Sequence, residues 1–365
     1  MKVIKINLSK NSYNVYIKQN LLESVGSHIK ELNLGNFAII LASRSVFTFY
    51  KNKIEKSFAK FPHSIIVLPD GETAKTQASL FKIIQGIIKL DKLNRKVFIV
   101  CMGGGTVGDV GGFASSVYKR GIPYVQVPTT LLAQIDASIG GKTAIDLKEA
   151  KNILGAFYQP KAVFVDPGFL NTLKKKQISE GLAEAVKYAV IKSSAFFSFL
   201  VINYREILSL KPSSISKVID TCAGIKAKIV EADETEKKSI RTILNFGHTF
   251  AHALEAASKY KKVSHGEAVS LGMLYAAFLS KKAGSCGMNE IYQIRDLLKK
   301  FELPVKCKYD LKAVYKAMSY DKKNVSGRFR MVLLEAIGKV KVVDGIPEGL
   351  ISKTLKECGD RKSVV

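Results

Sequence analysis

The feature that most constrains the fold is a change of hydrophobic pattern at Asp166-Pro167-Gly168. Before this point, short apolar segments that end in turn or glycine residues alternate with helical stretches such as 76–90, which is typical of a mostly parallel sheet covered by helices. After it, long helix-compatible runs replace the β pattern. We therefore expect an α/β domain over residues 1–168 and an all-α domain over 169–365. The expected strands are 1–8, 37–42, 64–68, 97–102, 124–127 and 162–165, and the expected helical runs are 180–191, 213–232, 247–259, 266–283 and 289–301.

The composition agrees with two globular domains and narrows the class of protein. Apolar residues make up 47% of the chain and charged residues 24%, and no apolar run is long enough to cross a bilayer. The first residues alternate like a strand and lack the unbroken apolar segment of a signal peptide. The five cysteines are scattered and never form a C-x-x-C pair, which favours reduced thiols. We expect a cytoplasmic protein without a membrane partner.

The charge balance is the one unusual feature of the composition. Lysine and arginine number 57 against 31 aspartates and glutamates, which gives a formal net charge of +26. Nucleic acid is therefore a second hypothesis for the partner. However, the lysines are spread over the whole length, and no known nucleic-acid module pattern accompanies them. We expect a solvated basic surface suited to an anionic substrate, and no nucleic-acid partner.

Three of the five histidines lie close together in the sequence. His248 and His252 are one helical turn apart on one face, and His265 follows shortly downstream. Imidazole nitrogens together with a carboxylate are typical ligands of a divalent cation such as zinc. The best carboxylate donor is Glu184, which lies in a helical run. The sequence therefore predicts a metal site, while a mere capping or packing role for His248 and His252 stays open as the alternative.

A glycine-rich loop directly follows the expected strand 97–102. Gly103, Gly105 and Gly108 satisfy G-x-G-x-x-G, a pattern that lets the backbone approach a pyrophosphate at a helix start. An ordinary Rossmann site follows the first strand and has an acidic residue about twenty positions further on, and neither holds here. We expect a Rossmann-like domain that binds a dinucleotide in a different sheet topology. A tight strand–helix turn without a ligand is the alternative.

Several sequence blocks between about residues 35 and 335 occur together in a characteristic order. They are 69–75, 103–113, 127–136, 140–143, 151–152, 180–188, 241–252, 265–267 and 321–323. Together they resemble the 3-dehydroquinate synthase family within the sugar-phosphate cyclases, and more distantly the iron-dependent alcohol and glycerol dehydrogenases. The resemblance implies a dehydroquinate synthase-like fold, a homodimer, and a role in the shikimate pathway of aromatic amino acid biosynthesis.

The reaction implied by the resemblance is that of a phosphate-eliminating carbon–oxygen lyase. It converts 3-deoxy-D-arabino-heptulosonate 7-phosphate into 3-dehydroquinate and phosphate. NAD oxidises a ring hydroxyl and later returns the hydride, and a divalent metal, Zn²⁺ or Co²⁺, acts as Lewis acid. Two alternatives remain, namely another cyclase such as 2-deoxy-scyllo-inosose synthase and a metal-dependent polyol dehydrogenase. Retention of Asn152, Lys226 and Arg241 together favours a substrate that carries a carboxylate.

The resemblance also assigns residues to the metal and to the cofactor. It implies metal ligation by Glu184, His248 and His265, so that His252 contacts the substrate instead. The residues that it implies for NAD span the first domain. They are Asp70, Glu72, Lys75, Gly104, Gly105, Asp109, Thr129, Thr130, Lys142 and Lys151.

The substrate residues implied by the resemblance are mostly cationic or amide side chains. Arg241 offers a planar fork for the carboxylate, while Lys142, Asn245 and His252 can donate to the phosphate. Arg120 is expected to reach across a two-fold interface to the neighbouring subunit's substrate. The full set is Arg120, Asp136, Lys142, Lys151, Asn152, Lys187, Lys226, Arg241, Asn245 and His252.

Three departures from the family pattern leave the metal ligands untouched. Ser43 stands where relatives often have Asp or Asn near the adenosine ribose. Ala251 replaces a glycine common between the two helix histidines. The loop 233–241 is one residue longer than expected and lacks its glycine.

Overall fold

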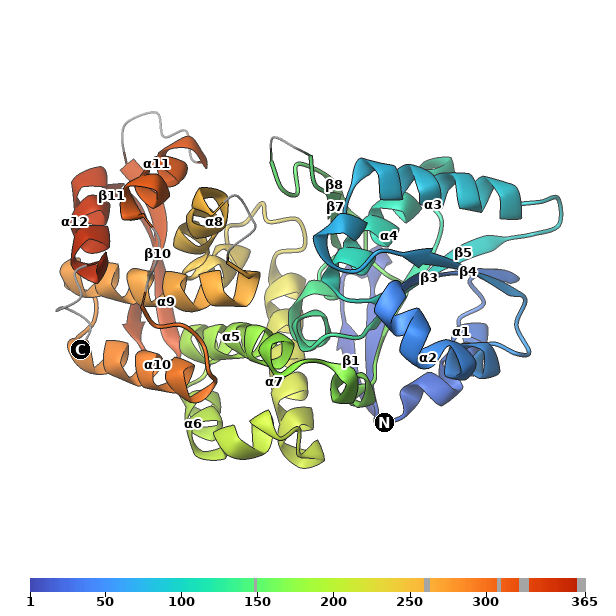
Figure 1. The fold of residues 1–365 in the computed structure, drawn as a ribbon, viewed down its shortest axis with the longest axis horizontal. Helices are drawn as coiled ribbons and strands as arrows, with labels where there is room; N and C mark the ends of the chain where they lie inside the picture. Colours follow the sequence, from blue (N-terminus) through green and yellow to red (C-terminus); the bar gives the residue numbers. More distant parts are fainter. Residues whose placement is uncertain (148–149, 259–262, 307–309, 322–327, 360–365) are drawn as a thin grey trace. The chain divides into compact units, whose positions relative to one another are not determined.

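The structure is a computed structural model that describes residues 1–147, 150–258, 263–306, 310–321 and 328–359 (Figure 1). Its chain forms two compact units. The first unit comprises residues 1–174 and 215–235, and the second comprises 175–214 and 236–365. Lys322 and Lys323 of the last sequence block, and Cys307, lie outside the described residues.

The first unit is built on a sheet with the strand order β1-β2-β9-β6-β5-β3-β4. The six strands β2-β9-β6-β5-β3-β4 run parallel to their neighbours, and β1 pairs antiparallel with β2. This confirms the expected mostly parallel sheet. The strands are β1 (Lys2–Ile6), β2 (Tyr13–Ile17), β3 (Phe37–Ser43), β4 (His63–Leu68), β5 (Val97–Gly103), β6 (Tyr124–Pro128) and β9 (Ala162–Val165).

Helices cover both faces of this sheet. In β3, Ile39 and Leu41 join a core cluster with α3 (Gln77–Leu90) and α4 (Gly105–Val117). The alternate residues Ala38 and Ile40 join a cluster with α1 (Val25–Glu31) and α2 (Arg44–Ser57). Figure 1 shows the two helix pairs on opposite sides of the strands. Because both faces are buried, the parallel strands read as continuous apolar runs.

The strand order places a topological switch point between β3 and β5. β4 lies on one side of β3 and β5 on the other. In open parallel sheets, ligands bind outside the carboxyl ends of the strands at such a point. β3 ends there at Ser43, whose hydroxyl accepts a hydrogen bond from the Val46 N–H at 3.4 Å and caps α2. β5 ends there at Gly103, so the glycine loop occupies the expected ligand-binding edge.

Smaller elements complete the first unit. β7 (Lys142–Ile145) and β8 (Leu154–Phe157) form an antiparallel hairpin that packs on α4. A π-helical turn, η5 (Ala133–Ala137), follows β6. The short helices of this unit are η1 (Ser9–Asn11), η2 (Leu21–Ser24), η3 (Gly71–Ala74), η4 (Tyr118–Arg120) and η6 (Pro167–Thr172).

Helix α7 (Pro212–Ala232) belongs largely to the first unit. The sequence pattern instead predicts that this segment belongs to the domain that begins at residue 169. Polar contacts with β1 and the residue after it explain the difference, since Lys2 pairs with Asp220 at 3.1 Å and the Asn7 N–H donates to Glu231 at 2.7 Å. Such contacts between distant residues leave no local signal in the sequence.

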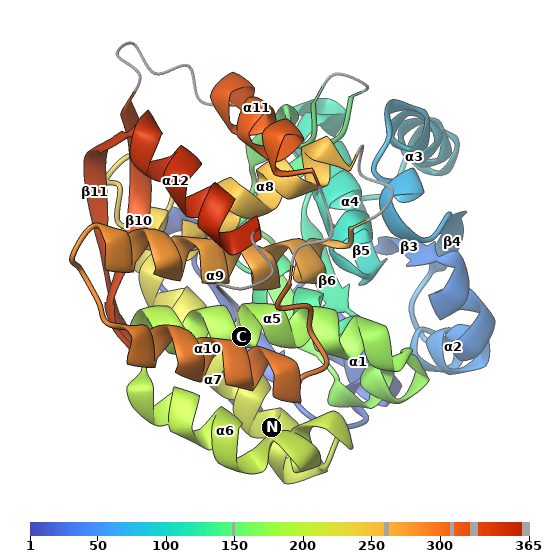
Figure 2. The same cartoon turned by 60° about the vertical axis from the view of Figure 1, so that its left-hand side comes forward.

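The second unit is helical, as expected, and is arranged around α9 (His265–Lys282). Figure 2 shows α9 between α8 (His248–Ala257) and α5 (Lys175–Lys192), and it also packs on α10 (Met288–Lys300) and α12 (Glu348–Gly359). Most of α9 from Gly266 to Ser280 is buried. The remaining helices are α6 (Ser194–Leu208), α11 (Leu311–Asp321) and the short η7 (Arg241–Asn245).

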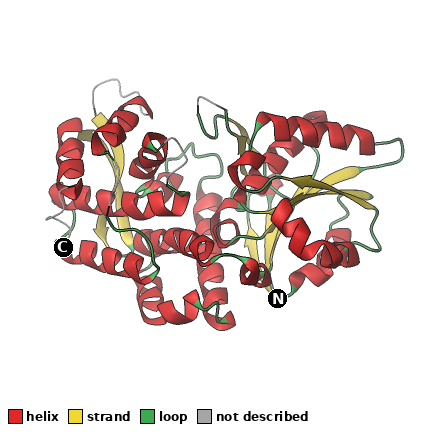
Figure 3. Cartoon of the chain, viewed as in Figure 1, coloured by secondary structure: helices red, strands yellow, loops and turns green. Residues whose placement is uncertain are grey.

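One hairpin corrects the expectation of an all-α second domain. β10 (Arg328–Ala336) and β11 (Lys339–Pro347) pair antiparallel within the helical unit, as Figure 3 shows in yellow. Met331, Val332, Leu333 and Leu334 of β10 are all buried. A strand buried on both faces has no alternating pattern, so its sequence cannot be told from a buried helical segment.

Two further observations concern the described residues only. No helix among them is both long and apolar enough to cross a membrane. Cys101, Cys222, Cys286 and Cys358 carry free thiols.

Gly272 lies inside α9, where this helix meets the start of α8. A Cβ at this position would lie 2.3 Å from the carbonyl oxygen of Gly247, a backbone atom that no side-chain rotation can move. We expect Gly272→Ala to lower the free energy of unfolding by about 1–3 kcal/mol, the usual cost of overpacking. Urea unfolding followed by circular dichroism measures the change.

Gly349, in the first turn of α12, provides the matched control. A Cβ there meets no atom within 4 Å, and alanine is the better helix former by about 0.5–1 kcal/mol. Gly349→Ala should therefore keep or slightly raise the stability. Equal unfolding midpoints for the two variants would contradict the close backbone contact between α8 and α9.

Candidate active site

The candidate site in the second unit starts from an ion pair inside α5. Glu184 has no exposed side-chain surface, Lys187 is only 2% exposed, and the two form a close ion pair one turn apart. Burial alone would raise the pKa of Glu184. The charge of Lys187 and the contacts with His248 and His265 outweigh burial and hold this pKa well below its ordinary value. The helix therefore presents an ionised carboxylate within the protein interior.

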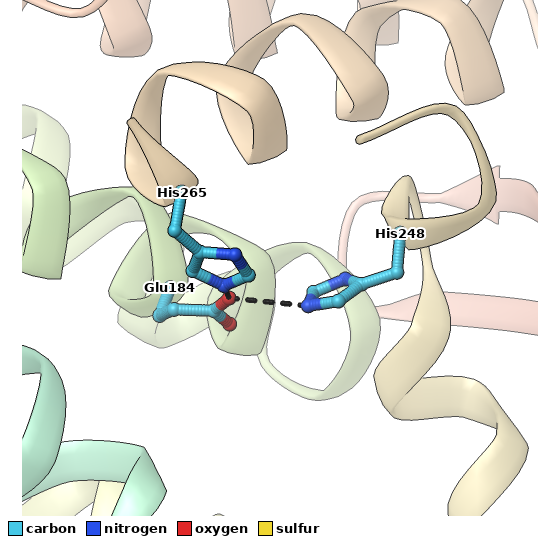
Figure 4. Close-up of side chains that lie close together, drawn as sticks. All are labelled: Glu184, His248 and His265. Atoms are coloured by element: carbon cyan, nitrogen blue, oxygen red, sulfur yellow. Dashed lines mark hydrogen bonds and ion pairs between the residues drawn. The ribbon is translucent and has the colours of Figure 1, made fainter. Parts of the chain in front are cut away.

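Two helix starts bring imidazoles to this carboxylate. His248 opens α8 directly after Gly247, which has a left-handed φ of 79° that favours glycine. His265 opens α9, whose start is fixed by a capping box between Ser264 and Glu267. The Nε2 atoms of both histidines lie 3.3 Å from Oε1 of Glu184 (Figure 4). The ligand atoms of the three residues all lie within 4.8 Å of one another.

The chemistry of this donor set fits a divalent cation of the zinc type. One carboxylate and two imidazole nitrogens leave a further coordination position open. Burial and the neighbouring Lys187 lower the pKa of His248, which keeps its ring neutral as a metal ligand requires. Burial lowers the pKa of His265 as well, but Glu184 and Glu255 outweigh it and raise the value to about 10. The position of His265 thus attracts positive charge.

Three other predicted residues of the second unit lie near His248 in the sequence, on α8 and η7. His252 is exposed one turn further along α8, and its ring lies edge-on to that of His248 at 5.6 Å between centroids. Among the described residues, the cluster of possible ligands includes His265 and not His252. η7 carries Arg241, which is 2% exposed with Nε 3.4 Å from Oε1 of Glu236, and the exposed Asn245.

In the first unit, Lys75 is the centre of a polar network. It is 6% exposed, and its Nζ donates to Asp109 at 2.6 Å and to the side-chain oxygen of Asn152. Burial raises the pKa of Asp109 to about 6, against the opposing effect of Lys75. Lys151 lies 3.4 Å from Glu72 beside this network. The structure thus joins five predicted residues from η3, α4 and the β7–β8 connection.

A second polar pair of the first unit joins residues 90 positions apart. The π-helical turn η5 carries Asp136, and α7 supplies Lys226, which is 7% exposed. Lys226 Nζ donates to the Asp136 carbonyl oxygen at 2.7 Å and forms a close ion pair with its carboxylate. A wider turn of this kind inside a helix is often found at functional sites.

The glycine loop offers a backbone cradle at the start of α4. Gly104 is the N-cap and no side chain caps the helix, so the first N–H groups remain directed outward. A Cβ on Gly104 would lie 3.2 Å from Thr130, and one on Gly105 would lie 3.0 Å from Ala137. The Thr129 N–H donates to the Gly103 carbonyl oxygen at 2.9 Å. This helix start has no side-chain cap and no room for a side chain beside Thr130 and Ala137, which fits the binding of an anionic diphosphate.

Three predicted residues have other surroundings. Asp70 accepts hydrogen bonds from the backbone N–H and hydroxyl of Ser45, at 3.1 and 2.8 Å. Lys142 is exposed at the start of β7. Arg120 is exposed in η4 and has a φ of 64°.

The departures from the family pattern also have a place in the structure. Ala251 is fully buried on α8, and its N–H lies 3.0 Å from where a Cβ on Gly272 would be. In the loop 233–241, Glu236 and Ser239 each adopt a φ of 61°, which is left-handed backbone that glycine would adopt at lower cost.

Sequence reasoning did not single out Glu255, which lies on α8 and is buried beside His265. Its Oε1 is 3.6 Å from Nδ1 of His265. The available signal was its spacing, because residue 255 follows residue 248 by two helical turns and shares its face.

Two family models match the chain in succession. They describe the N-terminal part of 3-dehydroquinate synthase over residues 65–180 and its C-terminal part over 181–324. The 3-dehydroquinate synthase of Nitrosococcus oceani is 38% identical over 360 residues, which cover 97% of this chain and 99% of the relative. That of Syntrophotalea carbinolica is 40% identical over 364 residues, which cover 98% and 99%.

Solved structures of related enzymes have the same fold. A 2-epi-5-epi-valiolone synthase from Streptomyces hygroscopicus with NAD⁺ and Zn²⁺ bound has a TM-score of 0.88 at 26% identity, covering 98% of this chain and 99% of its own. A 2-deoxy-scyllo-inosose synthase complexed with carbaglucose-6-phosphate, NAD⁺ and Co²⁺ has a TM-score of 0.87 at 27% identity, with the same coverage. A probable glycerol dehydrogenase from Sinorhizobium meliloti, with a TM-score of 0.67 at 13% identity, shares the fold alone.

The buried pair of Lys187 and Glu184 makes a testable contribution to stability. Replacing Lys187 with methionine leaves a buried carboxylate without its nearest charge partner. We expect Lys187→Met to lower the free energy of unfolding by about 3–5 kcal/mol in the presence of a chelator. Lys192 is exposed at the end of the same helix, and Lys192→Met should change stability by no more than about 0.5 kcal/mol. Similar urea midpoints for both variants would show that the pair is not needed.

Proposed function

The chain belongs to the 3-dehydroquinate synthase family, and we propose from this premise that it converts 3-deoxy-D-arabino-heptulosonate 7-phosphate into 3-dehydroquinate and phosphate. The curated relatives that carry this name are 36–40% identical over nearly the whole chain. The solved cyclases of other specificity are only 26–27% identical. The proposal makes the protein a carbon–oxygen lyase of aromatic amino acid biosynthesis.

The observation that carries the proposal is the cluster of the buried Glu184 with the half-buried His248 and His265. We assign these three residues to a catalytic divalent metal, Zn²⁺ or Co²⁺, because both ions prefer imidazole and carboxylate ligands in this number. The cofactor is NAD, as in the solved cyclases. When bound, NAD exchanges a hydride with the substrate, and the metal acts as a Lewis acid on the reacting oxygens.

In this proposal, the remaining predicted residues bind and orient NAD and the substrate. The bare helix start at Gly104 and Gly105 holds the NAD diphosphate. The network around Lys75 fixes the neighbouring cofactor contacts. Anionic groups of the substrate need cations held in place, and the buried Lys226 meets this need through its pairing with Asp136. The other assigned groups are Asp70, Glu72, Asp109, Thr129, Thr130, Lys142, Lys151, Asn152, Lys187, Asn245 and His252.

Arg241 favours this reaction over the alternatives. Its guanidinium is 2% exposed and held near Glu236, so it is a fixed planar donor suited to a carboxylate. A cyclase that acts on a carboxylate-free sugar, such as 2-deoxy-scyllo-inosose synthase, has no need of this group. A metal-dependent polyol dehydrogenase needs still fewer anion-binding residues.

A homodimer is part of the proposal. Lys119 and Arg120 both adopt left-handed backbone, with φ of 47° and 64°, which is strain that functional positions often carry. The Tyr158 hydroxyl donates to the Ile122 carbonyl oxygen at 2.9 Å, so this turn lies beside the end of β8. On β8, Leu154 and Phe157 are each 45% exposed. A second copy that covers this apolar edge would receive Arg120 at its substrate.

We place the enzyme in the cytoplasm. Cys101, Cys222, Cys286 and Cys358 carry free thiols, which are typical of a reducing compartment. The substrate is a small phosphorylated sugar acid, and the proposal assigns no nucleic-acid partner to the net charge of +26.

The direct test incubates purified protein with the heptulosonate phosphate, NAD⁺ and Zn²⁺ and measures phosphate release and product identity. We expect 3-dehydroquinate and phosphate in equal amounts without net NADH, since the hydride is returned. Chelation should abolish turnover, and Glu184→Ala should lower both metal content and activity. Full metal content and full activity in Glu184→Ala would refute the assigned metal centre.

Arg241→Ala tests the carboxylate contact. We expect a loss in kcat/KM equivalent to about 2–5 kcal/mol, the cost of truncating one partner of a buried charge pair. Arg205→Ala, at an exposed position of α6, should leave kcat/KM unchanged. If Arg241→Ala keeps the wild-type preference over a carboxylate-free analogue, Arg241 does not bind the carboxylate.

Mixed dimers test the role of Arg120. Chains with Arg120→Ala and chains with His252→Ala, each nearly inactive alone, are combined under conditions that exchange subunits. One site of each mixed dimer is then intact, so random pairing should restore about a quarter of the wild-type activity. Mixing Arg241→Ala with His252→Ala chains is the control, because neither site is then complete. No recovery despite verified exchange would show that Arg120 does not act across the interface.

A further inference from the structure

The ring of His265 faces a carboxylate on each side. Nε2 lies 3.3 Å from Oε1 of Glu184, and Nδ1 lies 3.6 Å from Oε1 of Glu255, within ion-pair reach. Figure 4 shows the first of these contacts and places the other ring nitrogen away from Glu184. His265 itself is the first residue of α9 and is 34% exposed. Its backbone is fixed by the capping box, but its ring needs a partner to fix its orientation.

Glu255 is placed by the same helix that supplies His248. The two residues are two turns apart on one face of α8, so this helix offers a ligand at its start and a carboxylate near its end. The Glu255 side chain is only 7% exposed. Burial of a carboxylate is costly unless it is paired, and His265 is a described partner at this position.

We propose that Glu255 is a positioning residue that accepts the Nδ1–H of His265 and thereby presents the Nε2 lone pair to a cation held with Glu184 and His248. A carboxylate behind a ligating histidine fixes the ring plane and the tautomer and makes the imidazole a better donor. This inference rests on the metal centre of the proposed function. It adds a fourth residue, which does not touch the metal, to the three ligands.

Glu267 allows a matched comparison, because it is a carboxylate two positions from His265 with different partners. Its Oε2 accepts from the Ser264 N–H at 2.9 Å and from the Ser264 hydroxyl at 3.0 Å. Its Oε1 pairs with Lys176 at 2.9 Å. Glu267→Gln keeps a side-chain oxygen that can accept from Ser264, loses the ion pair with Lys176, and leaves the Nδ1 side of His265 unchanged.

The test measures zinc affinity of the full chain by competition with a chromophoric chelator after the protein has been stripped of metal. We expect Glu255→Ala to bind zinc about 10–100-fold more weakly than the wild type. Glu255→Gln should be intermediate, since its amide oxygen still accepts from Nδ1. Glu267→Gln should bind as the wild type does. In Co²⁺-loaded samples, the visible absorption bands should shift in Glu255→Ala and be largely restored in Glu255→Gln.

Thermal unfolding of the stripped proteins separates positioning from packing. We expect the Glu255→Ala and Glu255→Gln proteins to unfold at similar temperatures despite their different zinc affinities. Wild-type zinc affinity and spectrum in Glu255→Ala would overturn the inference alone, and so would zinc affinities that merely follow the unfolding temperatures. Failure of the wild-type protein to bind zinc more tightly than Glu184→Ala would overturn the metal centre itself, and the inference with it.

Discussion

A carboxylate without exposed surface is tolerated only where cations and hydrogen-bond donors surround it. Glu184 obtains these partners from three helices: Lys187 from its own α5, His248 from the start of α8 and His265 from the start of α9. The partners that this one carboxylate needs therefore lie at the starts of two other helices. The same arrangement that satisfies the buried charge also collects a set of ligands suited to a divalent cation, so stability and chemistry depend on the same contacts.

Such a meeting of helix starts is possible only where side chains are absent. A Cβ on Gly266 would lie 2.4 Å from the Cα of Glu180 in α5, and one on Gly272 would lie 2.3 Å from the carbonyl oxygen of Gly247. Glycine thus allows α9 to touch α5 at one point and α8 at another. Because backbone atoms form these contacts, a side chain at either glycine would force the helices apart.

The sequence predicts the parts of this protein that have a local pattern. The buried parallel strands and the glycine loop can be predicted from apolar runs that end in turn or glycine residues. Strand β10 cannot be predicted in this way, because both of its faces are buried. Helical spacing indicates His248 and His252 as a pair of ligands. In the structure, Glu184 of α5 instead contacts His248 at the start of α8 and His265 at the start of α9. Long-range pairs such as Lys226 with Asp136 are invisible to periodicity, and only the family resemblance pointed to both residues.

Helix α7 has a consequence for the order in which the protein is made. The first unit takes residues 215–235 from beyond the segment 175–214, which belongs to the second unit. During synthesis, all strands of the sheet are therefore made before the helix that supplies Lys226. Forty residues of the other unit are made before Lys226 can pair with Asp136. The two units cannot mature strictly one after the other, as the domains of many chains do. Their folding is interleaved by the path of the chain itself.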